Sequence, residues 1–197
     1  MIRPDLSLIA DLIPDRARVL DLGCGNGALM QHLTRAKDCR GTGVDIDNDA
    51  VLEAIRGGVD VVELDLDTQL GEFADDSYDV VVLSRTLQVV RDPEEVLAQM
   101  SRIGRKLIVS MPNFGMWRNR LRLLAGHMPM SRDLPYDWYD SPNLHHATLV
   151  DLEAFLTSHR LRIEQRVALS EDGSTGGLVE RFPNLLAGAA IYRLGRA

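Results

Sequence analysis

The most informative stretch of this sequence is Val19-Leu20-Asp21-Leu22-Gly23-Cys24-Gly25-Asn26-Gly27, an apolar run that leads directly into a glycine-rich turn. The residues that follow, Ala28, Leu29, Met30 and Leu33, have the spacing of a helix. A strand, a glycine turn and a helix in this order let the backbone approach a ligand closely and point the first N–H groups of the helix toward it. The stretch therefore predicts a cofactor site at the end of a buried strand.

Similar apolar runs rich in β-branched residues recur and predict buried parallel strands. Together with the first run, they cover residues 19–22, 43–46, 59–64, 79–83 and 106–109. Segments with helical spacing lie between them, and the clearest begins at Pro93, with Asp92 as predicted N-cap and Glu95 completing a capping box. Strands and helices that alternate in this way imply βαβ crossovers, hence a doubly wound Rossmann-like α/β fold with a mostly parallel sheet.

The last third of the chain has a different pattern. Leu161, Ile163, Val167 and Leu169 alternate with polar residues, which predicts a half-exposed antiparallel strand. The apolar run 189–194 is expected to return beside it, so that the sheet ends in an antiparallel C-terminal hairpin.

Composition limits the class of protein. With 197 residues, the chain is expected to form a single domain that needs neither disulfides nor a metal for stability. A net charge of −7 argues against binding to nucleic acid or to an anionic membrane surface. Only Cys24 and Cys39 are present, and no basic-then-apolar leader opens the sequence, so we expect a cytoplasmic protein without a disulfide.

The glycine spacing alone does not decide the cofactor, because Gly23, Gly25 and Ala28 also satisfy the G-x-G-x-x-G/A dinucleotide fingerprint. Asp21 favours a different ligand, since a carboxylate beside the turn repels a pyrophosphate but suits an ammonium and a sulfonium. S-Adenosylmethionine carries both of these groups. An NAD-dependent oxidoreductase stays open as the less favoured alternative.

Acidic residues end the next two predicted strands. Asp45 stands 18 positions after Gly27, close to where an acid accepts hydrogen bonds from a ribose, and Asp65 is expected to accept one from the adenine amino group. The predicted cofactor-binding residues are Asp21, Gly23, Cys24, Gly25, Asn26, Gly27, Asp45, Ile46, Asp65, Leu66 and Ser84.

A calcium loop is the competing interpretation of the acidic run that starts at Asp45. It is disfavoured because Ala50 stands where that loop needs glycine and Arg56 where it needs glutamate. Asp47 or Asn48 is instead expected to cap a helix, and no metal site is predicted.

No catalytic residue can be assigned from the sequence. Methyl transfer from a sulfonium depends mainly on positioning the acceptor, so the absence of a catalytic motif excludes little. The candidates at the expected methyl-facing edge are Ser84, Arg85, Thr86, Asn113, His145 and His146. The two histidines lack the spacing of a helical metal site, and a hydrogen-bonding or surface role is favoured for them.

Residues 111–147 form an insertion that is too long for an ordinary connection. Half of the aromatic residues of the chain lie there, together with four arginines: Phe114, Trp117, Tyr136, Trp138, Tyr139, Arg118, Arg120, Arg122 and Arg132. One interpretation is an amphipathic helix over 116–125, with Trp117, Leu121 and Leu124 packed inward and the arginines in solvent. The other is a lid or docking surface, because aromatic and arginine side chains anchor protein interfaces.

Taken together, D-x-G-x-G-x-G at 21–27 and the acids after the second and third strands resemble the S-adenosylmethionine-dependent methyltransferase superfamily over about residues 17–110. Longer strings resemble one family within it, the methionine biosynthesis protein MetW family. They are Leu83-Ser84-Arg85-Thr86-Leu87-Gln88, the run Ser110-Met111-Pro112-Asn113-Phe114-Gly115-Met116-Trp117-Arg118, and Leu134-Pro135-Tyr136-Asp137-Trp138-Tyr139-Asp140-Ser141-Pro142-Asn143-Leu144-His145. Arg85 stands where that family is expected to carry glutamine.

The resemblance implies a MetW-like protein that binds S-adenosylmethionine or S-adenosylhomocysteine and acts as partner or activator of a homoserine O-acyltransferase, in a homo- or hetero-oligomer. The alternative is an autonomous S-adenosylmethionine-dependent methyltransferase acting on a small molecule, motivated by the intact glycine turn.

Overall fold

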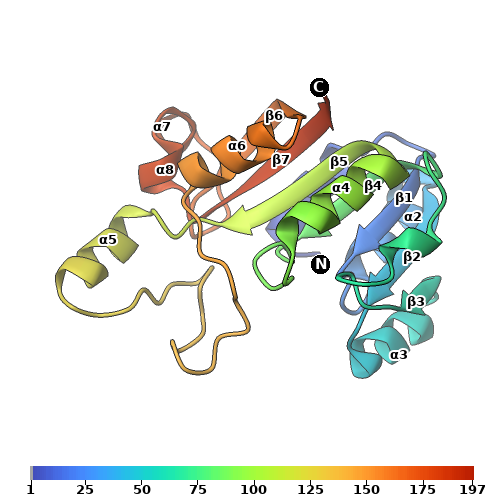
Figure 1. The fold of residues 1–197 in the computed structure, drawn as a ribbon, viewed down its shortest axis with the longest axis horizontal. Coiled ribbons are helices and arrows are strands. Elements are labelled where there is room, and N and C mark those ends of the chain that lie inside the picture. Colours follow the sequence, from blue (N-terminus) through green and yellow to red (C-terminus); the bar gives the residue numbers. More distant parts are fainter. Residues whose placement is uncertain (1) are drawn as a thin grey trace.

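The computed structural model describes residues 2–197, which form a seven-stranded mixed sheet with helices on both faces (Figure 1). The strands are β1 Arg18–Leu22, β2 Arg40–Asp45, β3 Val61–Glu63, β4 Tyr78–Ser84, β5 Gly104–Pro112, β6 Leu161–Leu169 and β7 Ala189–Arg196. The helices are α1 Pro4–Asp11, α2 Ala28–Lys37, α3 Asn48–Arg56, α4 Pro93–Ile103, α5 Trp117–Leu124, α6 Leu149–Ser158, α7 Gly177–Arg181, α8 Pro183–Leu186 and the 3-10 turn η1 Leu70–Glu72.

The strand order is β3-β2-β1-β4-β5-β7-β6. Strands β1 to β5 are parallel, whereas β7 is antiparallel to both β5 and β6. The doubly wound α/β fold with an antiparallel C-terminal hairpin is therefore confirmed. The order reverses between β1 and β4, and open α/β sheets bind ligands at the carboxyl ends of the strands at such a reversal.

Alternation along the central strands supplies both faces of the core. On β4, Val81 and Leu83 pack toward α4 and α6, whereas Val80 and Val82 pack toward α1 and α2. The strand is therefore buried on both faces, as a continuous apolar run predicts for a parallel strand. None of the helices in residues 2–197 is both long and apolar enough to cross a membrane.

The boundaries of β3 and β5 differ from the prediction for different reasons. β3 has three residues rather than six, because the Val59 N–H donates to the Ala54 carbonyl and closes the end of α3 instead of joining the sheet. β5 is longer than predicted, because its last residues, Met111 and Pro112, pair with Ala190 and Ala189 of β7, a long-range contact that local sequence does not encode.

Helix capping was predicted correctly at two positions and incorrectly in one detail. Asp47 caps α3 by accepting from the Asp49 and Ala50 N–H groups, and Asp92 caps α4 by accepting from Glu95 N–H at 3.1 Å. The capping box is incomplete, because the Glu95 carboxylate accepts from Gln99 instead of reaching back to Asp92.

Candidate cofactor site

The glycine turn follows β1 directly and lies at the point where the strand order reverses. Gly23, Gly25 and Gly27 have φ values of 71°, 53° and 74°, all in the left-handed region that favours glycine. The Gly23 and Cys24 N–H groups donate to the Val44 carbonyl at 2.8 and 3.0 Å, which fixes the turn against the end of β2. The turn therefore follows one backbone path, in which the Gly27 N–H also bonds internally, to the Cys24 carbonyl at 3.0 Å.

Two of these glycines differ in what surrounds them. A Cβ at Gly23 would collide with the side chain of Thr86, which follows β4, so the two loops touch at this point. A Cβ at Gly25 would meet nothing within 4 Å. Gly25 therefore borders open space, whereas Gly23 lies beneath a side chain.

Two adjacent cavities meet at Gly23, Gly25 and Thr86. The first, called here the β2 cavity, has a volume of about 380 Å³, and its lining is Gly23, Gly25, Asp45, Ile46, Asp65, Leu66, Asp67, Thr86, Val89, Val90 and Arg91. The second, the α1 cavity, has a volume of about 520 Å³, and its lining is Ile2, Arg3, Leu6, Asp21, Gly23, Cys24, Gly25, Asn26, Ala28, Leu29, Ser84, Arg85 and Thr86.

The structure thus places ten of the eleven predicted cofactor residues around these two cavities; Gly27 is the exception. Gly27 precedes α2, where a Cβ would collide with Val59, so it permits the turn and close packing rather than lining the space.

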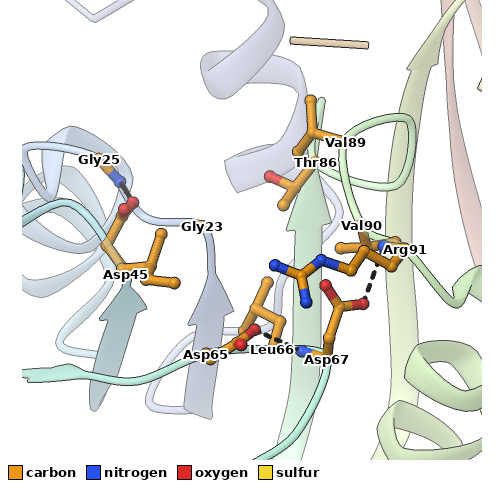
Figure 2. A pocket seen from close by; sticks show the side chains of 11 residues that line it. Gly23, Gly25, Asp45, Asp65, Leu66, Asp67, Thr86, Val89, Val90 and Arg91 are labelled. Carbon is orange, nitrogen blue, oxygen red and sulfur yellow. Dashed lines mark hydrogen bonds between the residues drawn. The ribbon is translucent and has the colours of Figure 1, made fainter. Parts of the chain in front are cut away.

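Asp45 links the turn to β2. Its Oδ2 accepts from the Gly25 N–H at 2.7 Å and its Oδ1 from the Asp47 N–H at 3.0 Å. Figure 2 shows Asp45 on one side of the β2 cavity, with Val90 and Arg91 on the other. Each carboxylate oxygen keeps a second lone pair, so Asp45 can still accept a hydrogen bond from a hydroxyl group in the cavity.

The loop after β3 forms the floor of the same cavity. Asp65 Oδ1 accepts from the Asp67 N–H at 2.9 Å, and Asp67 Oδ1 accepts from the N–H groups of Arg91 and Asp92 at 2.9 and 3.2 Å. Asp67 therefore joins this loop to the start of α4 (Figure 2). Ile46, 65% exposed, leaves an apolar surface beside these acids.

Burial affects the ionisation of Asp21, near the end of β1. Asp21 is buried, and burial together with the nearby Asp45 carboxylate raises its pKa to about 7. Burial and the same two acids raise the pKa of the Cys24 thiol to about 12. Cys24 is therefore a neutral thiol at physiological pH, and Cys24 and Cys39 are both free.

Sequence reasoning missed the contribution of the N-terminal helix. Arg3 and Leu6 line the α1 cavity, and Arg3 forms an ion pair with Asp5 at 3.2 Å. No sequence signal connects residue 3 to the loops after β1 and β4. The apolar pair Val89 and Val90 was also missed, although two valines beyond the end of a parallel strand are a usable signal for a ligand-facing surface.

The structure gives Asn113 a different setting from the one expected of an acceptor-binding residue. It is 1% exposed, its Nδ2 donates to the carbonyls of Asn184 and Ala187, and its Oδ1 accepts from the Gly115 N–H. It follows the carboxyl end of β5 but lines neither cavity, and its side chain connects the end of β5 to the segment around α8.

The two histidines belong to the return path of the insertion. His145 hydrogen-bonds through Nε2 to the Val90 carbonyl at 3.1 Å, and His146 stacks on Phe114. The N–H groups of Leu144 and His145 both donate to the Gln88 carbonyl, so the insertion supports the loop that lines the β2 cavity. Among residues 2–197, no three His, Cys, Asp or Glu side chains gather as metal ligands would.

The helix of the insertion does not pack as the amphipathic interpretation expected. α5 and the loop after it project away from the sheet (Figure 1), and Trp117, Leu121 and Leu124 are 40%, 55% and 83% exposed. That interpretation was wrong because no core lies opposite this face. Nor is Arg118 merely solvated, since it forms an ion pair with Glu171 at 2.8 Å.

A family model described as methionine biosynthesis protein MetW matches residues 3–194. The chain belongs to the MetW family. A bifunctional methionine biosynthesis protein MetXA/MetW from Rhodopirellula baltica is 33% identical over 202 residues, which cover 98% of this chain and 32% of the relative. The chain thus spans about a third of the length of the curated relatives it matches.

Comparison with solved structures shows which fold this member of the MetW family shares. An S-adenosylmethionine-dependent methyltransferase from Mesorhizobium loti superposes with a TM-score of 0.72 at 18% identity, over 98% of each chain. One from Thermotoga maritima superposes with a TM-score of 0.70 at 17% identity, over 98% of this chain and 88% of that one. This member of the MetW family therefore has the fold of S-adenosylmethionine-dependent methyltransferases.

Proposed function

We propose that the protein binds S-adenosylmethionine or S-adenosylhomocysteine and acts as partner and activator of a homoserine O-acyltransferase. The observation that carries the partner role is the fused relative, in which a MetW segment like this chain shares one polypeptide with a MetXA segment. We take that MetXA segment to be the acyltransferase implied by the family resemblance. Fusion of two chains in one organism supports their association as separate chains in another.

The residues of the two cavities fit the cofactor. Asp45 is available to a ribose hydroxyl group, and Asp21, beside the α1 cavity, suits the ammonium of the amino-acid end. Ile46 and Leu66 offer apolar contact for adenine, with Asp65 as an acceptor for its amino group. When bound, S-adenosylmethionine supplies an activated methyl group. If the protein is a sensor, the amount bound instead reflects the level of this downstream product of methionine synthesis.

The exposed surface of the insertion supports docking there. Over half of the large apolar side chains exposed in residues 2–197 lie in 111–147: Trp117, Leu121, Leu123, Leu124, Met128, Met130, Tyr136, Trp138, Tyr139 and Leu144. A concentration of apolar side chains of this kind marks an interaction site more often than a solvated surface, and aromatic residues dominate interface energetics. We call this set the insertion surface and assign the acyltransferase to it.

The test is the homoserine O-acylation rate of the acyltransferase from the same source, measured with and without this protein and with and without S-adenosylmethionine. A rate increase on adding the protein is expected, and dependence on S-adenosylmethionine would make the glycine turn a sensor. An unchanged rate, with no complex in sedimentation velocity, would contradict the partner role.

The second candidate is an autonomous methyltransferase on a small molecule, favoured by the open α1 cavity beside Ser84 and Thr86. Incubation with methyl-labelled S-adenosylmethionine and a metabolite extract tests it. Label on a small molecule would support this activity, and label confined to the cofactor would count against it.

A further inference from the structure

Arg85 has a strained backbone at the carboxyl end of β4. Its φ is 56°, in the left-handed region that an arginine rarely adopts, and its N–H donates to the carbonyl and Oγ of Ser110 at 3.0 and 3.1 Å. Such strain costs about 1 kcal/mol or more and persists where the surroundings enforce it, often at functional sites. These two hydrogen bonds to Ser110 of β5 therefore fix the backbone from which the Arg85 side chain extends.

The guanidinium of Arg85 is fixed as firmly as its backbone. Its Nε lies 3.1 Å from Asp5 of α1, and its Nη2 donates to Asp133 of the insertion at 2.7 Å. Both acids are nearly buried, with side chains 10% and 7% exposed. Within residues 2–197, Nη1 makes no hydrogen bond to protein, and Arg85 lines the α1 cavity. Arg85 also lines a smaller cavity, about 40 Å³, together with Asp5 and Asp133. In the part of the chain that the structure describes, one N–H edge of an immobilised cation is thus without a protein partner between two cavities.

The charges around the α1 cavity are of both signs. Arg3 lines it with Arg85, while Asp21 lies in the same lining beside the glycine turn. Arg3 and Arg85 share Asp5, so one carboxylate is divided between two guanidinium groups. A lining with two cations and one separate acid suits a zwitterion, in which a carboxylate and an ammonium are bound to the same carbon.

We propose that Arg85, assisted by Arg3, binds the carboxylate of an α-amino acid group whose ammonium lies toward Asp21. This inference rests on the proposed cofactor, whose amino-acid end presents both groups, and adds a carboxylate site to it. A separate amino acid beside the nucleoside presents the same chemistry, and the experiment distinguishes the two sources.

The experiment compares two nucleosides that differ in the amino-acid end. S-Adenosylhomocysteine and 5′-methylthioadenosine are titrated calorimetrically into the wild type, Arg85→Gln and Arg118→Gln. Arg85→Gln removes a charge-assisted hydrogen bond to the carboxylate, so the affinity for S-adenosylhomocysteine is expected to fall by about tenfold or more. The affinity for methylthioadenosine is expected to stay within about twofold of the wild type. Arg118→Gln is the matched control, because it removes another ion pair of the insertion, with Glu171, away from both cavities.

Equal loss of affinity for both nucleosides in Arg85→Gln would overturn the carboxylate site. Unchanged affinity for both nucleosides would also overturn it, unless Arg85→Gln abolishes binding of L-homoserine. If Arg85→Gln does not fold in a thermal unfolding test, Arg85→Lys replaces it and is expected to retain part of the preference for S-adenosylhomocysteine. Binding of L-homoserine that Arg85→Gln abolishes, with S-adenosylhomocysteine unaffected, would support the site and assign it to a separate amino acid. Failure of the wild type to bind either nucleoside would refute the proposed cofactor, and the carboxylate site with it.

Discussion

The glycine turn and the insertion carry most of the residues to which function is assigned, but they are held in place in different ways. The turn is positioned by its own backbone, with three left-handed glycines and two N–H groups donating to Val44. The insertion is positioned by side chains from distant parts of the molecule, such as Arg85 on Asp133 and Arg118 on Glu171. The turn's conformation thus depends on its own glycines and on backbone bonds to the neighbouring strand β2, whereas that of the insertion depends on side chains from distant elements.

The two regions also differ in what they expose. The turn borders two concave cavities that Asp21, Asp45 and Asp65 line together with other polar and apolar groups, as in a small-molecule site. The insertion exposes apolar side chains on a helix that projects from the sheet (Figure 1). The comparison supports the proposed ligand site in the first region and the proposed protein-binding site in the second, and each prediction below alters one region while leaving the other intact.

The largest expected effect comes from Gly25→Leu. A side chain at this position points into open cavity and must adopt a φ near 53°, so it occupies the space required by the ligand. We expect S-adenosylhomocysteine affinity to fall by more than about 100-fold in calorimetric titration, since such a clash removes the ligand's closest backbone contact.

The matched control is Gly126→Leu in the insertion. Gly126 has a φ of 81° and no atom within 4 Å of an added Cβ, so it imposes similar backbone strain far from the cavities. Binding that survives in Gly25→Leu, or is lost equally in Gly126→Leu, would show that the turn does not contact the ligand.

Removal of two exposed aromatic side chains of the insertion tests its proposed role in binding the acyltransferase. In the double variant Trp117→Ala, Trp138→Ala, we expect association with the acyltransferase to weaken by about 30-fold or more, because buried tryptophans dominate interface energetics. Leu52→Ala with Ile55→Ala is the control, since both side chains are exposed on α3, at the other end of the sheet. Unchanged affinity in biolayer interferometry would place the interface elsewhere.

The start of the insertion, where Asn113 follows β5, is expected to respond in stability. Asn113→Ala removes the bonds to Asn184, Ala187 and Gly115 and leaves buried backbone groups without partners, which costs about 2 kcal/mol. Urea unfolding measures it, and the exposed Asn48→Ala should stay within about 0.5 kcal/mol of the wild type. Full stability of Asn113→Ala together with loss of methyl transfer would restore Asn113 as a catalytic candidate.

Features with a local cause could be predicted from the sequence. The mostly parallel sheet follows from the alternation of apolar strands and helices, and the Asp47 cap follows from the preference of that position for a short acceptor. The assembly of Asp21, Asp45 and Asp65 at one edge follows because each ends or follows a parallel strand.

Features that depend on distant partners could not be predicted. Arg85 acquires its role from Asp5 and Asp133, which lie 80 and 48 positions away in sequence. The periodicity of Trp117, Leu121 and Leu124 indicated a buried helix face, yet periodicity does not say whether a core lies opposite. Local pattern therefore predicted most of the residues that meet at the β2 and α1 cavities, and only the structure could place the insertion.

The smallest expected effect is a pH dependence of the affinity for S-adenosylhomocysteine, which the ionisation of Asp21 should cause. Its pKa is raised to about 7 by burial and by Asp45, so near neutral pH the ligand-free carboxyl is protonated in part of the molecules. An ammonium binds the ionised form, so S-adenosylhomocysteine affinity should be highest above pH 7 and fall by at most about tenfold per pH unit below it.

The stability of the ligand-free protein should change with pH in the opposite direction. Because the folded pKa of Asp21 lies above its ordinary value of 3.8, this group's contribution is fully present below that value and is lost as pH rises through about 7. In Asp21→Asn both dependences should flatten while the insertion still binds the acyltransferase. A wild-type affinity that stays constant between roughly pH 6 and pH 8 would mean that the ammonium lies away from Asp21. The α1 cavity would then hold the amino-acid end through its arginines alone.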